Sequence, residues 1–102
     1  MDFIKVTLKG EDFTFTALDF EQLQTLESDF EVLKTLGTDG SMPNAEQRKS
    51  IIAICTASAS TKHPSMTVEQ MARLLTLGNI AGALKAVAGV TGLETGDASG
   101  NA

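Results

Sequence analysis

The sequence predicts an α+β fold, in which an N-terminal two-stranded β-hairpin is followed by three to four α-helices that make up most of the chain. Apolar and polar residues alternate near the N-terminus, which is typical of strands buried on one face. Beyond them, three residue pairs have the spacing of a helix-capping box, and each precedes apolar residues three or four positions apart. A chain of 102 residues fits one domain, which we place at residues 1–93.

The hairpin is expected at residues 2–17. Its apolar residues alternate with polar ones in both strands: Ile4, Val6, Leu8, Phe13, Phe15 and Ala17. Gly10 and Glu11 are expected to form a two-residue type II′ loop, because glycine readily adopts the positive φ that this turn needs. The pairs that follow from this loop are Lys9 with Asp12, Leu8 with Phe13, Val6 with Phe15 and Ile4 with Ala17. All three apolar pairs then share one face.

The first helix is expected at about residues 20–36. Asp19 and Gln22 have the N-cap and N3 spacing of a capping box, which satisfies free backbone N–H groups at the start of a helix. Its apolar residues step along one face: Leu23, Leu26, Phe30 and Leu33. Acidic residues occupy much of the opposite face, and Gly37 is suited to end the helix.

Three further helices and a disordered tail are expected at about residues 44–62, 67–77, 79–91 and 94–102. Two of these helices begin with capping-box pairs: Asn44 with Gln47, and Thr67 with Gln70. Pro64 disfavours helical backbone at the residue before it and should separate these two helices. Asn79 can cap the last helix, whose internal glycines make it dependent on packing partners. The tail has no apolar residue of any size to bury.

The charged residues are unevenly distributed along the chain, whose net charge is −5. Residues 1–39 hold nine acidic residues and three lysines, whereas residues 40–92 hold two acidic and five basic residues. Two solvated faces would explain this distribution. Alternatively, the acidic end of one copy meets the basic end of a neighbouring copy, head to tail, in a homo-oligomer.

Several classes of protein are disfavoured by composition. A helix-turn-helix DNA-binding domain would have only Lys62 and Arg73 near its recognition helix, too few to hold phosphates, so nucleic acid is not an expected partner. The single cysteine, Cys55, excludes an intramolecular disulfide. No basic-then-apolar leader and no apolar run of about 20 residues is present, so we expect a cytoplasmic protein that does not bind membranes.

The residues that most often carry chemistry have structural explanations, so we expect no catalytic, metal or cofactor site and no enzyme. His63 lies in a short link and is expected to interact with the last carbonyls of the preceding helix. Cys55 lies in the most apolar run and should behave as a small hydrophobe. The loop around Asp39 and Gly40 lacks the remaining oxygen ligands of a calcium site. Ser41 lacks the Asp-Ser-Leu context of an acyl-carrier domain.

Apolar residues are concentrated between positions 66 and 84, in excess of what so small a core should bury. We therefore expect some of them to form a protein-binding surface, to which methionine side chains adapt well. The candidate partner-binding residues are Met66, Met71, Leu74, Leu75, Leu77, Ile80 and Leu84.

The segment from His63 to Asn79, HPSMTVEQMARLLTLGN, resembles the tail assembly chaperones of long-tailed phages and prophages. In that family, a His-Pro-x-hydrophobic-Thr motif leads into a helix ending in Leu-Thr-x-x-Asn, and an Ala-rich helix follows. The resemblance covers the layout of the whole chain and about 17 residues in motif. It implies a non-catalytic protein that binds the tape measure protein, keeps it soluble and recruits tail tube subunits during virion assembly.

An alternative interpretation is a small regulatory or adaptor domain, such as an inhibitor, that is unrelated to phage tails. This domain would bind one folded partner in a one-to-one complex. A tail assembly chaperone would instead bind its long client in many copies.

Overall fold

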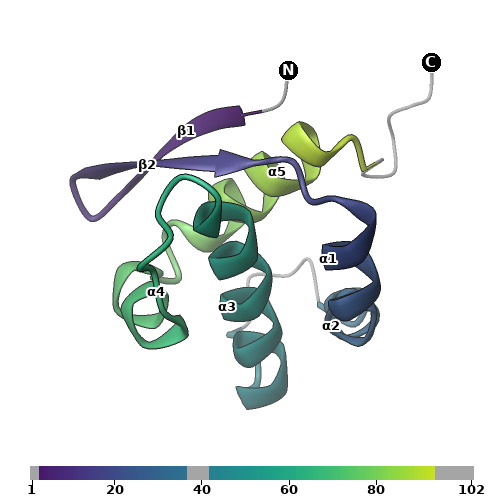
Figure 1. Cartoon of the computed structure of the whole chain (residues 1–102). Helices are drawn as coiled ribbons and strands as arrows, with labels where there is room; N and C mark the ends of the chain where they lie inside the picture. The colour runs from purple at the N-terminus through teal and green to yellow at the C-terminus, as the bar shows by residue number, and fades with distance from the viewer. Residues whose placement is uncertain (1–2, 37–41, 94–102) are drawn as a thin grey trace, which may run out of the picture.

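A computed structural model, which describes residues 3–36 and 42–93, confirms the α+β fold. The elements within these ranges are β1 (Phe3–Leu8), β2 (Glu11–Thr16), α1 (Phe20–Thr25), α2 (Glu27–Leu33), α3 (Ala45–Ser60), α4 (Val68–Leu74) and α5 (Ile80–Thr91). The hairpin lies over one end of α3 and along α5, and α4 and the α1–α2 pair lie on opposite sides of α3 (Figure 1). The predicted tail at 94–102, together with Asp39, Gly40 and Ser41, lies outside the described residues.

The hairpin register differs from the predicted one by two residues. Lys9 and Gly10 form the turn, and both have positive φ (52° and 83°), as in a type I′ turn. The apolar residues of β1 therefore face different partners: Ile4 lies opposite Phe15, Val6 opposite Phe13 and Leu8 opposite Glu11. Because the shift is even, the same side chains still share one face. The predicted pairing of Lys9 with Asp12 was wrong, since the Asp12 carboxylate accepts a 2.7 Å hydrogen bond from Thr7 Oγ1.

The predicted first helix is divided into α1 and α2, so five helices replace the three to four expected. The capping box of Asp19 and Gln22 is confirmed. The helix breaks at Leu26, whose φ and ψ are −96° and 9°. The residue just before the break, Thr25, donates through Oγ1 to the Glu21 carbonyl one turn back, a type of bond that tends to bend helices. The break lets α2 pack along α3, where Ser50 Oγ donates to the Asp29 carboxylate at 2.8 Å.

The capping boxes of α3 and α4 are also confirmed, but α4 ends at Leu74 and not near residue 77. Thr76 and Asn79 exchange two hydrogen bonds, from each backbone N–H to the other side chain. The Asn79 amide also donates to the Leu74 carbonyl at 3.0 Å. This compact turn competes with continued helix. Asn79 consequently makes no side-chain capping bond to α5, contrary to the prediction.

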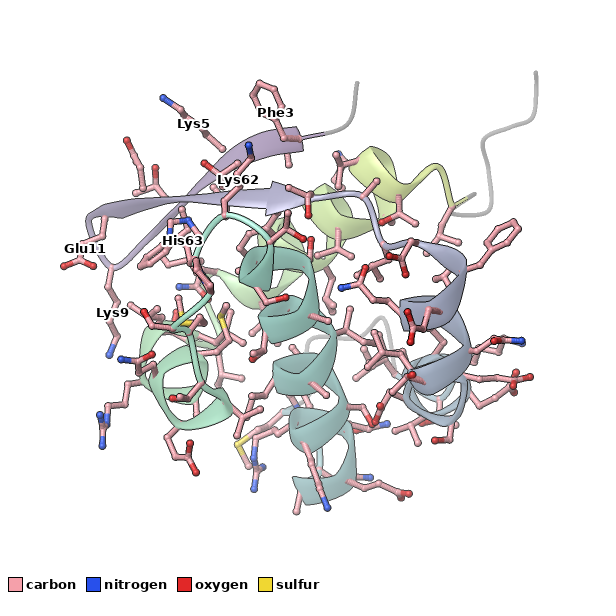
Figure 2. All side chains as sticks on the ribbon, viewed as in Figure 1. Phe3, Lys5, Lys9, Glu11, Lys62 and His63 are labelled. Carbon is pink, nitrogen blue, oxygen red and sulfur yellow. The ribbon has the colours of Figure 1, made fainter. Side chains whose placement is uncertain are left out.

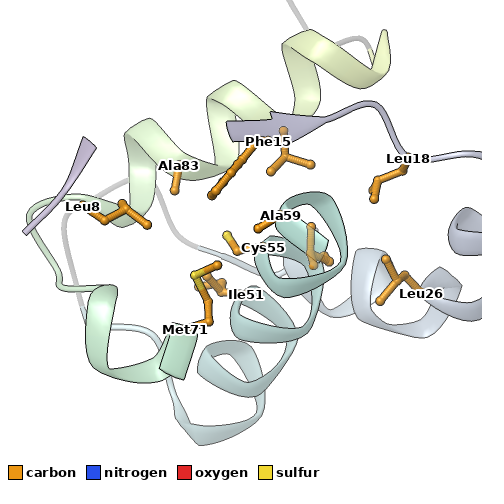
Figure 3. Close-up of a cluster of buried hydrophobic side chains, with 11 residues drawn as sticks. Leu8, Phe15, Leu18, Leu26, Ile51, Cys55, Ala59, Met71 and Ala83 are labelled. Atoms are coloured by element: carbon orange, nitrogen blue, oxygen red, sulfur yellow. The ribbon is translucent and has the colours of Figure 1, made fainter. Parts of the chain in front are cut away.

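The core brings together buried side chains from the hairpin, α3, α4 and α5, with Leu18 before α1 and Leu26 between α1 and α2 (Figure 3). Its largest fully buried members are Phe15, Leu8, Ile51, Ile54, Met71 and Val87. A reciprocal pair of hydrogen bonds ties β2 to α3 inside this core. Thr16 Oγ1 donates to the Ser58 carbonyl at 3.1 Å, and Ser58 Oγ donates to the Thr16 carbonyl at 2.8 Å. Both buried hydroxyls are thus satisfied, and the strand is fixed against the helix.

Within residues 3–36 and 42–93, no helix has both the length and the apolar content needed to cross a membrane.

Candidate protein-binding surface

The seven candidate partner-binding residues do not form one patch. Met71 is completely buried, so it belongs to the core and cannot contact a partner on the surface of this structure. Leu77 is 63% exposed, in the turn between α4 and α5. The other five are partly buried: Met66, Leu74, Leu75, Ile80 and Leu84. Most of the apolar side chains that we expected to be exposed between positions 66 and 84 are therefore partly buried by the fold itself.

Two of the candidates, Met66 and Leu74, line a depression of about 380 Å³ between the hairpin and α4. Phe13 and His63 contribute aromatic rings to this depression. Much of the remaining lining is polar: Glu11, Ser65, Gln70 and Arg73. Such a mixed surface is less suited to an apolar client than a continuous apolar groove.

A larger and more apolar groove lies elsewhere, between α2 and α5, with α3 contributing to its floor. Its volume is about 650 Å³. The lining residues are Phe30, Leu33, Lys34, Leu36, Ile54, Leu84, Lys85, Val87, Ala88 and Leu93. We refer to this set as the α2–α5 groove. Leu84 is the one candidate partner-binding residue in this lining, and the other lining residues were not among the candidates.

The spacing of side chains explains why two short helices make this groove. Phe30 and Leu33 are three positions apart on α2, and Leu84 and Ala88 are four apart on α5, so each pair forms a short apolar stripe. All four side chains are only partly buried, although they adjoin the core residue Ile54. The groove therefore presents apolar surface to a partner without any change in the core.

Two lysines are the charged residues of the α2–α5 groove. Lys34 Nζ lies 3.1 Å from the Glu31 carboxylate, in an exposed ion pair. Lys85 makes no ion pair within the described part of the chain. The groove thus combines an apolar floor with positive charge, an arrangement that favours an apolar segment carrying acidic residues.

His63 has a different role from the predicted one. Its ring accepts at Nε2 a 3.0 Å hydrogen bond from the Thr14 backbone N–H, and it packs edge-on against Phe13 at 5.3 Å between ring centroids (Figure 2). Its hydrogen bond to the preceding helix comes from the backbone, where the His63 N–H donates to the Ala59 carbonyl at 2.9 Å. The His63 side chain therefore connects the α3–α4 link to β2, two segments that are far apart in the sequence.

Replacing His63 with alanine is expected to lower the free energy of unfolding by roughly 1–2 kcal/mol, because the part-buried Thr14 N–H loses its acceptor. Urea denaturation followed by far-UV circular dichroism would measure the loss. The adjacent, exposed Lys62→Ala should stay within about 0.5 kcal/mol of wild type. Equal stability of the two variants would contradict this role for the ring.

Cys55 has the environment of a core residue. It is fully buried, and burial raises the pKa of its thiol to about 12. Since the thiolate is the nucleophilic form, this sulfur is poorly reactive in the folded protein. Across residues 3–36 and 42–93, no group of three or more His, Cys, Asp and Glu side chains is arranged to hold a metal ion.

No family model, curated protein or solved structure matches the chain closely enough to assign it to a family.

Proposed function

We propose that this chain is a non-catalytic phage tail assembly chaperone, which binds the tape measure protein and helps recruit tail tube subunits in the cytoplasm of the bacterial host. The observation that supports this function is the α2–α5 groove, an apolar channel with lysines and no acidic residue in its lining. The family and the identity of the client come from the resemblance of the segment from His63 to Asn79.

The shape and chemistry of the groove suit an amphipathic helix. A helix of this kind lays its apolar face into a groove through residues at i, i+3, i+4 and i+7. The long, largely helical tape measure protein would offer such faces repeatedly along its length. Acidic residues beside the apolar face would meet Lys34 and Lys85.

The acidic surface of the chain supports the solubilising part of the function. Glu21, Glu27 and Glu31 are exposed on α1 and α2, the two helices that lie across α3 from α4. A client helix covered by several such subunits would gain negative charge while its apolar face is hidden. Like-charged complexes repel one another and remain soluble.

Coexpression with the tape measure protein encoded nearby tests this function. We expect the client to remain soluble only in the presence of this chain, and the two to elute together in size-exclusion chromatography. Multi-angle light scattering should give several copies of the chain per client. Failure to co-purify would contradict the proposal. A one-to-one complex would contradict it as well and would favour the adaptor alternative.

A further inference from the structure

We propose that copies of this chain bind one another head to tail, with Phe20 of one copy inserted into a second groove, between α3 and α4, of the next. This inference goes beyond the proposed function, because it concerns the chain by itself and holds for any client. It rests on an exposed aromatic side chain, a matching apolar groove and the charges that surround each of them.

The inserted element is the start of α1. Phe20 is 84% exposed, the highest value among the large hydrophobic side chains of the described residues. Asp19 and Glu21 flank it in the sequence and are also exposed. A phenylalanine can bury on the order of 150 Å² of surface or more when it enters an apolar pocket. Exposed aromatic side chains of this kind often anchor protein–protein interfaces.

The receiving groove has a volume of about 420 Å³, which leaves room for an aromatic ring. Ile52 and Ala53 of α3 and Val68 and Ala72 of α4 form its apolar lining. Val68 is 49% exposed in this groove, another large apolar side chain that the fold leaves half-uncovered. We refer to this site as the α3–α4 groove.

The charges at the two sites are complementary. Arg48 and Lys49 line the α3 side of the groove, where they would meet the carboxylates beside Phe20. Arg48 also donates to the Pro43 carbonyl at 2.8 Å, which fixes its guanidinium near the groove. Glu69, on the α4 side, has the unfavourable sign. The acidic residues of the incoming copy should therefore lie towards α3 and away from Glu69.

The positions of the two sites determine the type of assembly. In Figure 1, α1 and α4 lie on opposite sides of α3, so Phe20, the first residue of α1, and the α3–α4 groove belong to different surfaces of one copy. A contact between two different surfaces is heterologous, and it leaves one free site at each end of an assembly. Since a single aromatic anchor buries little area, association should be weak and dependent on concentration. Binding of several copies to adjacent sites on one client would raise their effective concentration.

Sedimentation velocity of the purified full-length chain, without any client, tests the aromatic contact. The weight-average sedimentation coefficient of the wild type should rise with concentration from tens of micromolar to the millimolar range. Phe20→Ala should abolish most of that rise. Phe3→Ala is the matched control, because Phe3 is another exposed phenylalanine (50%), on β1 and outside the lining of the α3–α4 groove, and this variant should behave as the wild type. Circular dichroism verifies that each variant is folded.

A charge exchange tests the orientation of the two copies. Glu21→Lys and Lys49→Glu should each weaken association at least about tenfold, and the double variant should recover most of the loss, because the pair is restored with reversed signs. Glu69→Gln should strengthen association, since it removes the like charge. A wild type that stays monomeric would overturn the proposal. An unchanged Phe20→Ala variant, or a double variant no better than the single ones, would overturn it too. None of these outcomes depends on binding of a tape measure protein.

Discussion

Replacing Phe15 with alanine is expected to lower the free energy of unfolding by about 3–5 kcal/mol, a large share of the total stability of a small domain. Phe15 is the largest fully buried side chain, and it extends from β2 to the surfaces of α3 and α5 (Figure 3). The substitution loses the free energy gained when the ring is transferred from water to the core. It also leaves a cavity where β2 meets α3 and α5.

Far-UV circular dichroism in a urea titration is the suitable measurement, because the chain has no tryptophan or tyrosine to report unfolding by fluorescence. Phe15→Leu keeps part of the volume and should give a smaller loss, which remains measurable even if the alanine variant does not fold. The exposed Phe20→Ala should change stability by less than about 0.5 kcal/mol. A Phe15→Ala variant as stable as the Phe20→Ala variant would contradict the position of Phe15 in the core.

The fold class could be predicted from the sequence because its signals are local. The capping boxes that begin at Asp19, Asn44 and Thr67 depend on residues three positions apart, and all three are present. The hairpin face depends on alternation, which survives an even shift of register. The register itself was not determined, because Gly10 suits both the first position of a type II′ turn and the second position of a type I′ turn.

The proposed binding groove could be predicted only in part, because it is made by tertiary packing. The α2–α5 groove joins Phe30 and Leu84, which are far apart in the sequence, and its α2 wall follows a helix break at Leu26 that the sequence did not predict. The apolar pattern around α4 indicates which side chains avoid water, but it does not indicate whether the core or a partner covers them. Met71 is covered by the core. Leu77 is exposed, because the Thr76–Asn79 turn ends α4 before this residue.

A double substitution in the α2–α5 groove, Leu33→Gln with Leu84→Gln, is expected to weaken binding of the tape measure protein at least about 30-fold. The two leucines come from facing helices, so the change makes both walls of the groove polar. Glutamine is compatible with helices, and both side chains are only partly buried, so the fold should persist. Binding of the labelled client segment, measured by fluorescence anisotropy, would give the ratio of dissociation constants.

Two comparisons separate the groove from other apolar surface. Phe3→Gln removes an exposed aromatic residue of β1 and should leave client affinity unchanged. Leu77→Gln, in the α4–α5 turn, distinguishes the surface favoured by the sequence pattern from the groove favoured by the structure. A loss of affinity in Leu77→Gln with none in the double variant would place the client on the turn and contradict the groove.

If the groove is the site, added salt should weaken binding of the client moderately. Lys34 and Lys85 attract acidic residues of the client, while the apolar contacts provide most of the affinity.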